Sequence, residues 1–467
     1  MRKRQMNGLL YGLAVATVAW IGFATASDAS ARDEGLDYDA SYRLVSMQND
    51  SEKGTLKQRV AALEEAIAKA DAAAKKAKAA AAKKPSVKVD GRVFLDWTWF
   101  TQDAGSVTQI GDQENGFEPR AAWIGVGGKM NQVFEWKLSM NFAGTQPNDL
   151  DDDFLSPVFQ DTYGQMNELP LVGHAKIGYF KEPMSLELQT SSRFITFMER
   201  SFVNDMIPSY NLGGMIFDTA FNDRVTWATG VFTGNLDNRT LRFQDDGHGA
   251  FWTSRATFLP WYDEGSGGRG LWHVGGSYSY HALNGEDARY RARPQCHIGS
   301  RIVDTTAMAA NYTNTVGVET AFLYGPFSIQ SEYVEAYVNR TGGDETAQFN
   351  AFYIQTSFFL TGENRSYSKK KGSFGRVTPY EPVFRVRDAD GCIQTGKGAW
   401  EVAYRLSTID LNDADITGGN ATTHTLGLNW YLTPNMRVVL NYINAETRKD
   451  GTTGIENIFM TRYQYDW

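Results

Sequence analysis

The chain has few of the residues from which catalytic and metal sites are built. Its 467 residues include six histidines and two cysteines. No H-E-x-x-H sequence, no cysteine pair with zinc-ligand spacing and no G-x-S-x-G sequence occurs in it. The sequence therefore predicts that the protein is not an enzyme and holds no metal or cofactor. A serine–histidine pair brought together only by folding, as in an esterase, is the alternative.

Long apolar runs are also missing after residue 31, and the mean hydropathy is −0.40. Before that point, basic residues at positions 2–4 precede an apolar run, Leu9–Ala24, and A-x-A sequences end at Ala26 and Ala31. This order is typical of a secretory signal peptide. We expect residues 1–31 to be one. A membrane-anchoring helix is the alternative, because about 20 apolar residues can span a bilayer.

Short segments of alternating polarity dominate residues 87–467, in a chain with 13% aromatic residues and 45 glycines. Sixteen candidate strands are centred on 87–99, 119–127, 133–143, 157–165, 172–180, 211–220, 224–233, 249–258, 270–281, 314–324, 327–338, 347–360, 398–408, 422–432, 435–446 and 456–467. Because about ten residues span a membrane as a tilted strand, this number predicts an all-β fold, a 16-stranded antiparallel transmembrane β-barrel. A secreted β-sandwich or β-solenoid would have a similar composition.

The C-terminal segment favours the membrane barrel over these soluble folds. Phe459, Tyr463, Tyr465 and Trp467 all occupy odd-numbered positions and therefore share one face of a strand. By the same rule, Trp400, Val402, Tyr404 and Leu406 face outward, which directs Glu401 and Arg405 inward. Arg92 and Lys137 are also expected to face inward. Charged side chains on the inner face predict a water-filled lumen.

The connection from 181 to 210 is too long for a hairpin turn, and long loops in compact proteins are usually functional. Pro183 ends the preceding strand, because proline cannot donate to a strand ladder. We expect this segment to fold into the barrel as a constriction loop that brings Lys181, Arg193 and Arg200 into the aqueous path. The alternative is an outward loop whose arginines pair with nearby glutamates, namely Glu182, Glu187 and Glu199.

Four stretches carry a resemblance to a known family. They read FKEPMSLELQTSSRFITFMERS, FEPRAAWIGVGGKMNQVFEWKLSMNFAG (117–144), GKGAWEVAYRLSTIDLND (396–413) and THTLGLNWYLTPNMRVVLNYINAE (423–446). These strings resemble outer-membrane porins of the phosphate-selective O and P type. The resemblance implies a trimeric barrel in the bacterial outer membrane that passes small anions such as phosphate by passive diffusion. The expected partners are these anions, outer-membrane lipids and two further copies of the chain.

For such a pathway we expect a row of cations formed by Lys176, Lys181, Arg193, Arg200 and Arg405. The sequence departs from the family pattern at Arg120-Ala121-Ala122-Trp123, where these porins are richer in arginine. A weakly selective general porin and a structural or adhesion barrel are therefore kept as alternatives. The formal net charge of −8 argues against nucleic acid as a partner.

Residues 32–86 are expected to lie in the periplasm and to form a short helix followed by an Ala/Lys-rich spacer. A heptad seam supports the helix and consists of Leu56, Val60, Leu63, Ile67, Ala70 and Ala74. A parallel trimeric coiled coil and a lone helix packed against the barrel rim are both compatible with this seam.

The two longest loops, 282–313 and 361–397, contain clusters of arginine and lysine and are interpreted as outer loops at the mouth. Cys296 and Cys392 lie in these two segments. In an oxidising compartment they could form a disulfide, and two separate thiols are the alternative. Loop 144–157 is acidic, and we interpret it as solvated, because its spacing does not match a calcium-binding loop.

Overall fold

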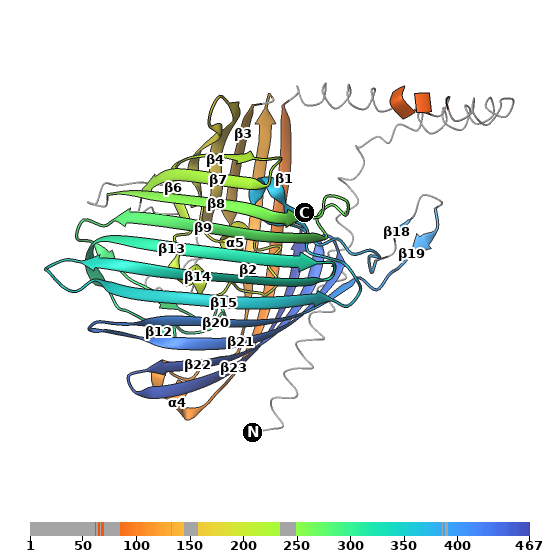
Figure 1. The fold of residues 1–467 in the computed structure, drawn as a ribbon. Coiled ribbons are helices and arrows are strands. Elements are labelled where there is room, and N and C mark those ends of the chain that lie inside the picture. Colours follow the sequence, from red (N-terminus) through yellow and green to blue (C-terminus); the bar gives the residue numbers. More distant parts are fainter. Residues whose placement is uncertain are drawn as a thin grey trace, which may run out of the picture. The chain divides into compact units, whose positions relative to one another are not determined.

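The computed structural model describes residues 61, 64, 65, 67–69, 85–131, 133–143, 157–233, 249–384, 386–387 and 391–467 (Figure 1). The chain divides into two compact units, Met1–Ala82 and Lys83–Trp467. In the first unit the six described residues are helical, and Lys69 pairs with Glu65 one turn away at 2.7 Å. The predicted signal peptide and most of the predicted coiled coil lie outside the described residues, as do 144–156 and 234–248.

In the second unit, the described residues form a barrel of sixteen antiparallel strands, one for each predicted segment. They are β1 (Ser86–Gln102), β2 (Gly116–Met130), β3 (Phe134–Asn141), β4 (Val158–Leu169), β5 (Gly173–Lys181), β6 (Tyr210–Ala220), β7 (Val225–Thr233), β8 (Ala250–Tyr262), β9 (Gly270–Ala282), β13 (Met308–Tyr324), β14 (Phe327–Arg340), β15 (Ala347–Phe359), β20 (Ala399–Asp413), β21 (Ile416–Thr433), β22 (Met436–Lys449) and β23 (Thr452–Asp466). The barrel closes where β1 pairs with β23, from Arg92 opposite Asp466 to Gln102 opposite Glu456.

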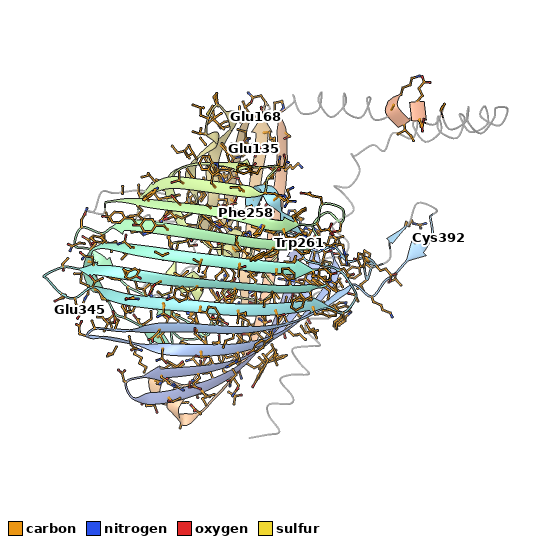
Figure 2. All side chains as sticks on the ribbon, viewed as in Figure 1. Glu135, Glu168, Phe258, Trp261, Glu345 and Cys392 are labelled. Atoms are coloured by element: carbon orange, nitrogen blue, oxygen red, sulfur yellow. The ribbon has the colours of Figure 1, made fainter. Side chains whose placement is uncertain are left out.

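The alternation in the sequence explains the two faces of the wall. In β22, Val439 and Asn441 are buried, whereas Tyr442 on the other face is 44% exposed. The outer face also holds stacked aromatic pairs such as Trp400 and Trp430, with ring centroids 5.0 Å apart. Phe258 and Trp261, labelled in Figure 2, are exposed on β8. These apolar outer side chains form the surface expected to contact lipid. Among the described residues, no helix has the length and apolarity required to cross a membrane.

Because successive strands run in opposite directions, the connections alternate between the two ends of the barrel. We call the end with the β5–β6 connection the loop end, and the end with the short β13–β14 turn the turn end. The connection from 360 to 398 joins β15 to β20 and therefore belongs to the turn end. The interpretation of 361–397 as an outer loop at the same mouth as 282–313 was wrong.

Three connections fold into the barrel. The constriction loop (182–209) contains α5 (Leu186–Gln189) and α6 (Val203–Met206), and its inward position confirms the prediction. The loop-end segment 283–307 contains β10 (Asp287–Ala288), β11 (Arg291–Ala292) and β12 (Val303–Asp304). The segment 360–398 is here named the turn-end loop. Its inward part contains β16 (Tyr367–Ser368), η3 (Lys369–Lys371) and β17 (Ser373–Phe374), and its later part contains β18 (Val386–Arg387) and β19 (Ile393–Gln394). A further short helix, α4 (Ala104–Ile110), lies between β1 and β2.

The inward segments form an apolar core with part of the barrel wall. Met184 and Phe202 of the constriction loop, Val303 of segment 283–307 and Phe349 of β15 are all completely buried in one cluster. The inner face of the wall is therefore not uniformly wet. Where the loops cover it, it is a packed protein interface.

The structure corrects the possible disulfide between Cys296 and Cys392, because it holds them as two separate thiols. Cys296 is buried inside the barrel, with its Sγ 3.9 Å from the Thr98 hydroxyl. Cys392 is exposed beside the β18–β19 hairpin, which extends away from the barrel wall (Figures 1 and 2). The two segments enter from opposite ends of the barrel, which explains the separation.

Candidate functional site in the barrel lumen

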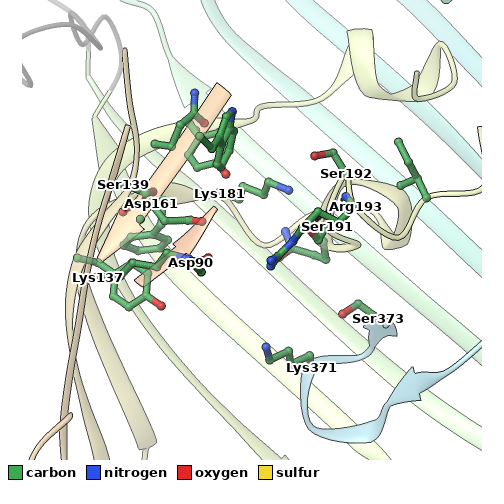
Figure 3. A pocket seen from close by; sticks show the side chains of 18 of the residues that line it. Asp90, Lys137, Ser139, Asp161, Lys181, Ser191, Ser192, Arg193, Lys371 and Ser373 are labelled. Carbon is green, nitrogen blue, oxygen red and sulfur yellow. Dashed lines mark hydrogen bonds and ion pairs between the residues drawn. The ribbon is translucent and has the colours of Figure 1, made fainter. Parts of the chain in front are cut away.

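One cavity of about 650 Å³ lies inside the barrel (Figure 3). Its walls are the inner faces of the first strands, mainly β1–β6, together with the constriction loop and the turn-end loop. Four of the five predicted pathway residues line it, namely Lys176, Lys181, Arg193 and Arg200. The structure brings these four around one space.

The fifth predicted residue, Arg405, does not line this cavity. Its side chain faces inward from β20, as the alternation predicts, but it is only 1% exposed. It pairs with Glu187 at 3.3 Å and donates to the Glu199 carbonyl oxygen at 3.0 Å and to Gln295 Oε1 at 2.7 Å. The constriction loop covers this part of the wall, so Arg405 holds the loop in place instead of facing the cavity.

The cavity cations of the constriction loop and the end of β5 have neutral partners. Lys181 Nζ donates to the Leu188 carbonyl oxygen at 2.7 Å, and Arg193 Nε donates to Ser191 Oγ at 3.3 Å. Arg200 donates to the carbonyl oxygens of Glu187 and Thr190, at 3.0 and 2.8 Å. No carboxylate of the described residues forms an ion pair with any of these three cations, so their charge is not cancelled by direct pairing.

The glutamates of the constriction loop pair elsewhere, which contradicts the alternative of an outward loop with internal ion pairs. Glu199 accepts a two-pronged contact from Arg120, at 2.9 and 3.0 Å, and a third bond from Arg462 at 2.8 Å. Burial works to raise the pKa of Glu199, but these guanidinium groups hold it well below its usual range. Glu182 accepts from Asn211 and from the Thr253 hydroxyl.

Three further cations that line the cavity form no ion pair with a carboxylate of the described residues, and they were not among the five predicted pathway residues. The Arg92 side chain of β1 lies over the Trp123 ring, with Cζ 3.4 Å from the ring centroid, and donates to Ser192 Oγ at 2.6 Å. Alternation along β1 already directs Arg92 inward. Lys370 and Lys371 reach the cavity from η3 of the turn-end loop. Periodicity could not identify these two lysines, because they lie in an irregular segment.

The cations occupy two levels along the barrel. Lys181 lies at the loop-end terminus of β5, and Lys176 lies five residues closer to the turn end, which is roughly 16 Å along a strand. Figure 3 shows Lys181, Arg193 and Lys371 directed into one space from the wall, the constriction loop and the turn-end loop, with Ser191, Ser192 and Ser373 nearby. An anion in this space would therefore meet ammonium, guanidinium and hydroxyl donors in succession.

Other cavity cations are neutralised by wall carboxylates. Arg462 pairs with Asp96 at 2.8 and 2.7 Å, Arg255 with Glu319 at 2.6 Å, and Lys137 with Asp90 at 3.0 Å. The lining also contains three further carboxylates, those of Glu135, Asp161 and Asp218. The unpaired cations on the loops and on β1 and β5 therefore set the local balance of charge.

A family model described as "Phosphate-selective porin O and P" matches residues 87–467, which is the whole barrel. The chain belongs to this family. It is 26% identical over 424 residues to Porin O of Pseudomonas aeruginosa, covering 82% of this chain and 89% of that protein. It is also 27% identical over 278 residues to an uncharacterized protein of Caulobacter vibrioides, covering 57% and 52% of the two chains.

Solved structures with a similar barrel include an anion-selective porin from Comamonas acidovorans, with 11% identity and a TM-score of 0.48 over 82% of this chain and all of that one. A loop-deletion mutant of OmpT from Vibrio cholerae has 11% identity and a TM-score of 0.49, over 82% of this chain and 99% of that one. The barrel itself is established here by its strand pairing. By family and fold, the protein is an outer-membrane channel of the porin type.

Proposed function

We propose that the channel conducts small anions, phosphate among them, in preference to cations. The observation that carries this proposal is the set of cations with neutral partners around the cavity, on the wall and on two inward loops. The family description, "Phosphate-selective porin O and P", supports phosphate as one solute. In a water-filled cleft with low-dielectric walls, charges of one sign raise the local concentration of anions.

The conduction mechanism follows from the spacing of the cations. An anion entering from the loop end meets Lys181, Arg193 and Arg200, whose donors replace part of its hydration shell. Nearer the turn end, the anion contacts Lys176 and Lys371 instead. Because binding is divided among several weak positions, the anion can leave each one, which conduction requires.

The proposal extends to assembly and location. We propose a homotrimer surrounded by outer-membrane lipids, with residues 32–86 in the periplasm. Chemical crosslinking of the detergent-solubilised protein should end at a trimer. A species that remains monomeric at all crosslinker concentrations would overturn this part.

Removal of charge at the cavity tests the anion preference. Reversal potentials across a planar bilayer in a KCl gradient should have the sign of a chloride-selective channel. Arg193→Gln and Lys371→Gln remove charge from two loop residues that pair with no carboxylate in the part of the chain that the structure describes, so each should move the reversal potential toward zero.

The matched control is Arg448→Gln, which removes an equal charge from a side chain that is 67% exposed outside the cavity and pairs with Glu446. It should leave the reversal potential unchanged. A wild-type channel with a cation-selective reversal potential would contradict the proposed function.

A further inference from the structure

Aromatic rings lie beside several of the unpaired cations of the cavity. Lys176 Nζ lies 4.4 Å from the ring centroid of Tyr163 and 5.3 Å from those of Phe180 and Phe217. These rings come from three adjacent strands, β4, β5 and β6, so they form one continuous patch of the wall. We call Lys176 and these three rings the aromatic station.

The same combination recurs at two other cations. Arg92 is stacked on Trp123, and Lys181 Nζ lies 5.7 Å from the Tyr210 centroid. Trp123 and its neighbour Ala121 both line the cavity. An anion that moves along these cations therefore moves along ring faces and a methyl group as well as along donors.

This lining suits some anions better than others. Inorganic phosphate is compact and binds best to several convergent donors, above all to guanidinium forks. Ring faces offer it no donor. A flat organic anion can place its carboxylate on an ammonium while its apolar body displaces water from an aromatic wall, which adds a favourable term that phosphate lacks.

Charge at the aromatic station also fits a carboxylate of charge minus one. No carboxylate of the described residues forms an ion pair with Lys176, and Lys371 enters the same cavity from the turn-end loop. The loop is fixed there because Arg255 donates to the Gly372 carbonyl oxygen at 2.9 Å. The Lys176 ammonium beside the ring faces, with the Lys371 ammonium in the same cavity, can hold a carboxylate at one end of a planar solute.

We infer that the channel prefers aromatic carboxylates to inorganic phosphate, and that the aromatic station is the part of the lumen that discriminates between them. This inference rests on the proposed anion preference and specifies the chemical class of the solute. The Lys176 ammonium attracts the carboxylate, and the rings of Tyr163 and Phe217 contact the solute's apolar body.

The test is inhibition of the chloride current through single channels by benzoate, acetate and phosphate. Benzoate and acetate carry the same charge, so their comparison isolates the ring. We expect benzoate to reduce the current at a concentration at least tenfold lower than either acetate or phosphate. Inhibition by phosphate at a lower concentration than benzoate would overturn the inference and leave the anion preference intact.

Variants then locate the effect. Tyr163→Thr removes a ring from the cavity but keeps a residue that favours strands, and should weaken inhibition by benzoate at least fivefold without changing inhibition by acetate. Trp252→Leu is the control, because Trp252 is 48% exposed on the outer face. If benzoate inhibited the wild type and the Tyr163 variant equally, the assignment of benzoate binding to the aromatic station would be contradicted.

A second variant tests the role of the rings independently, in case the Tyr163 variant fails to fold. Trp123→Arg exchanges a cavity ring for a cation and should lower the half-inhibiting concentration of phosphate while raising that of benzoate. A parallel change for both solutes would contradict the role of the rings. Chloride reversal potentials recorded on the same channels show separately whether the anion preference itself holds.

Discussion

At the scale of single residues, alternation predicts the direction of a side chain but not its surroundings. It directs Arg92 and Arg405 inward, and both are inward in the structure. Arg92 faces the cavity, whereas Arg405 is buried against the constriction loop. The difference arises from a loop more than two hundred residues away in sequence, which no local pattern in β20 encodes.

The two cysteines provide a test at this scale. Cys296 is buried, and burial raises the pKa of its thiol to about 12, so very little of the reactive thiolate is present at neutral pH. Cys392 is exposed. We expect a maleimide to label Cys392 first in the folded protein and both cysteines after denaturation, measured by mass spectrometry of peptides. Labelling that requires a reductant even after denaturation would indicate a disulfide and contradict the structure.

At the scale of elements, the constriction loop is held by side chains of the wall that reach its backbone. Arg437 donates to the Ile195 carbonyl oxygen at 2.8 Å, Arg462 to that of Met198 at 2.6 Å, and Gln464 to that of Arg193 at 3.0 Å. Buried carbonyl groups need such partners. The inward position of the loop was predictable from its length and composition, whereas the strands that hold it were not, because this register is set by tertiary packing.

The seam between β1 and β23 depends on a buried ion pair. Asp96 and Arg462 are directly opposite in the strand register, and each is 1% exposed. Arg462→Met leaves the Asp96 carboxylate without its partner in a buried site, which should cost about 3–5 kcal/mol of unfolding free energy. Denaturant unfolding in detergent micelles measures this loss.

The double variant Asp96→Leu/Arg462→Met is the control for this seam. It removes the unpaired Asp96 carboxylate and should recover part of the loss. The recovery is incomplete because Glu199 and the Met198 carbonyl oxygen still lose their contacts with Arg462. Additive losses from the two substitutions would contradict the view that they act as one pair.

At the scale of the whole molecule, the sequence predicted all sixteen strands, because period-two alternation is strong when one face meets lipid and the other meets water or protein. The end of the barrel to which 361–397 belongs was predicted wrongly, although the order of the strands was sufficient to assign it. This connection follows the twelfth strand, and in an antiparallel barrel an even-numbered strand ends at the turn end. Lys370 and Lys371 therefore enter the lumen from the side opposite to the constriction loop.

Which part of the inner wall is covered by loops and which part lines the cavity could not be predicted from alternation. Charged and polar residues alternate on β20–β22 as they do on β1–β5, yet the first group is covered by loops and the second lines the cavity. The conduction path is therefore expected to follow the side of the barrel formed by β1–β6 rather than the whole lumen.

Modification of introduced cysteines inside the open channel tests this path most directly, in a Cys392→Ser background that removes the exposed thiol. Lys181→Cys places a thiol on the cavity, and Ser407→Cys places one on the covered face of β20, where Ser407 is completely buried. A negatively charged methanethiosulfonate reagent should react at position 181 and reduce the current, faster than a positively charged reagent does, and should leave position 407 unmodified. Equal reaction at both positions, or no change in current after modification at 181, would contradict a water-filled, cation-lined path along this side of the barrel.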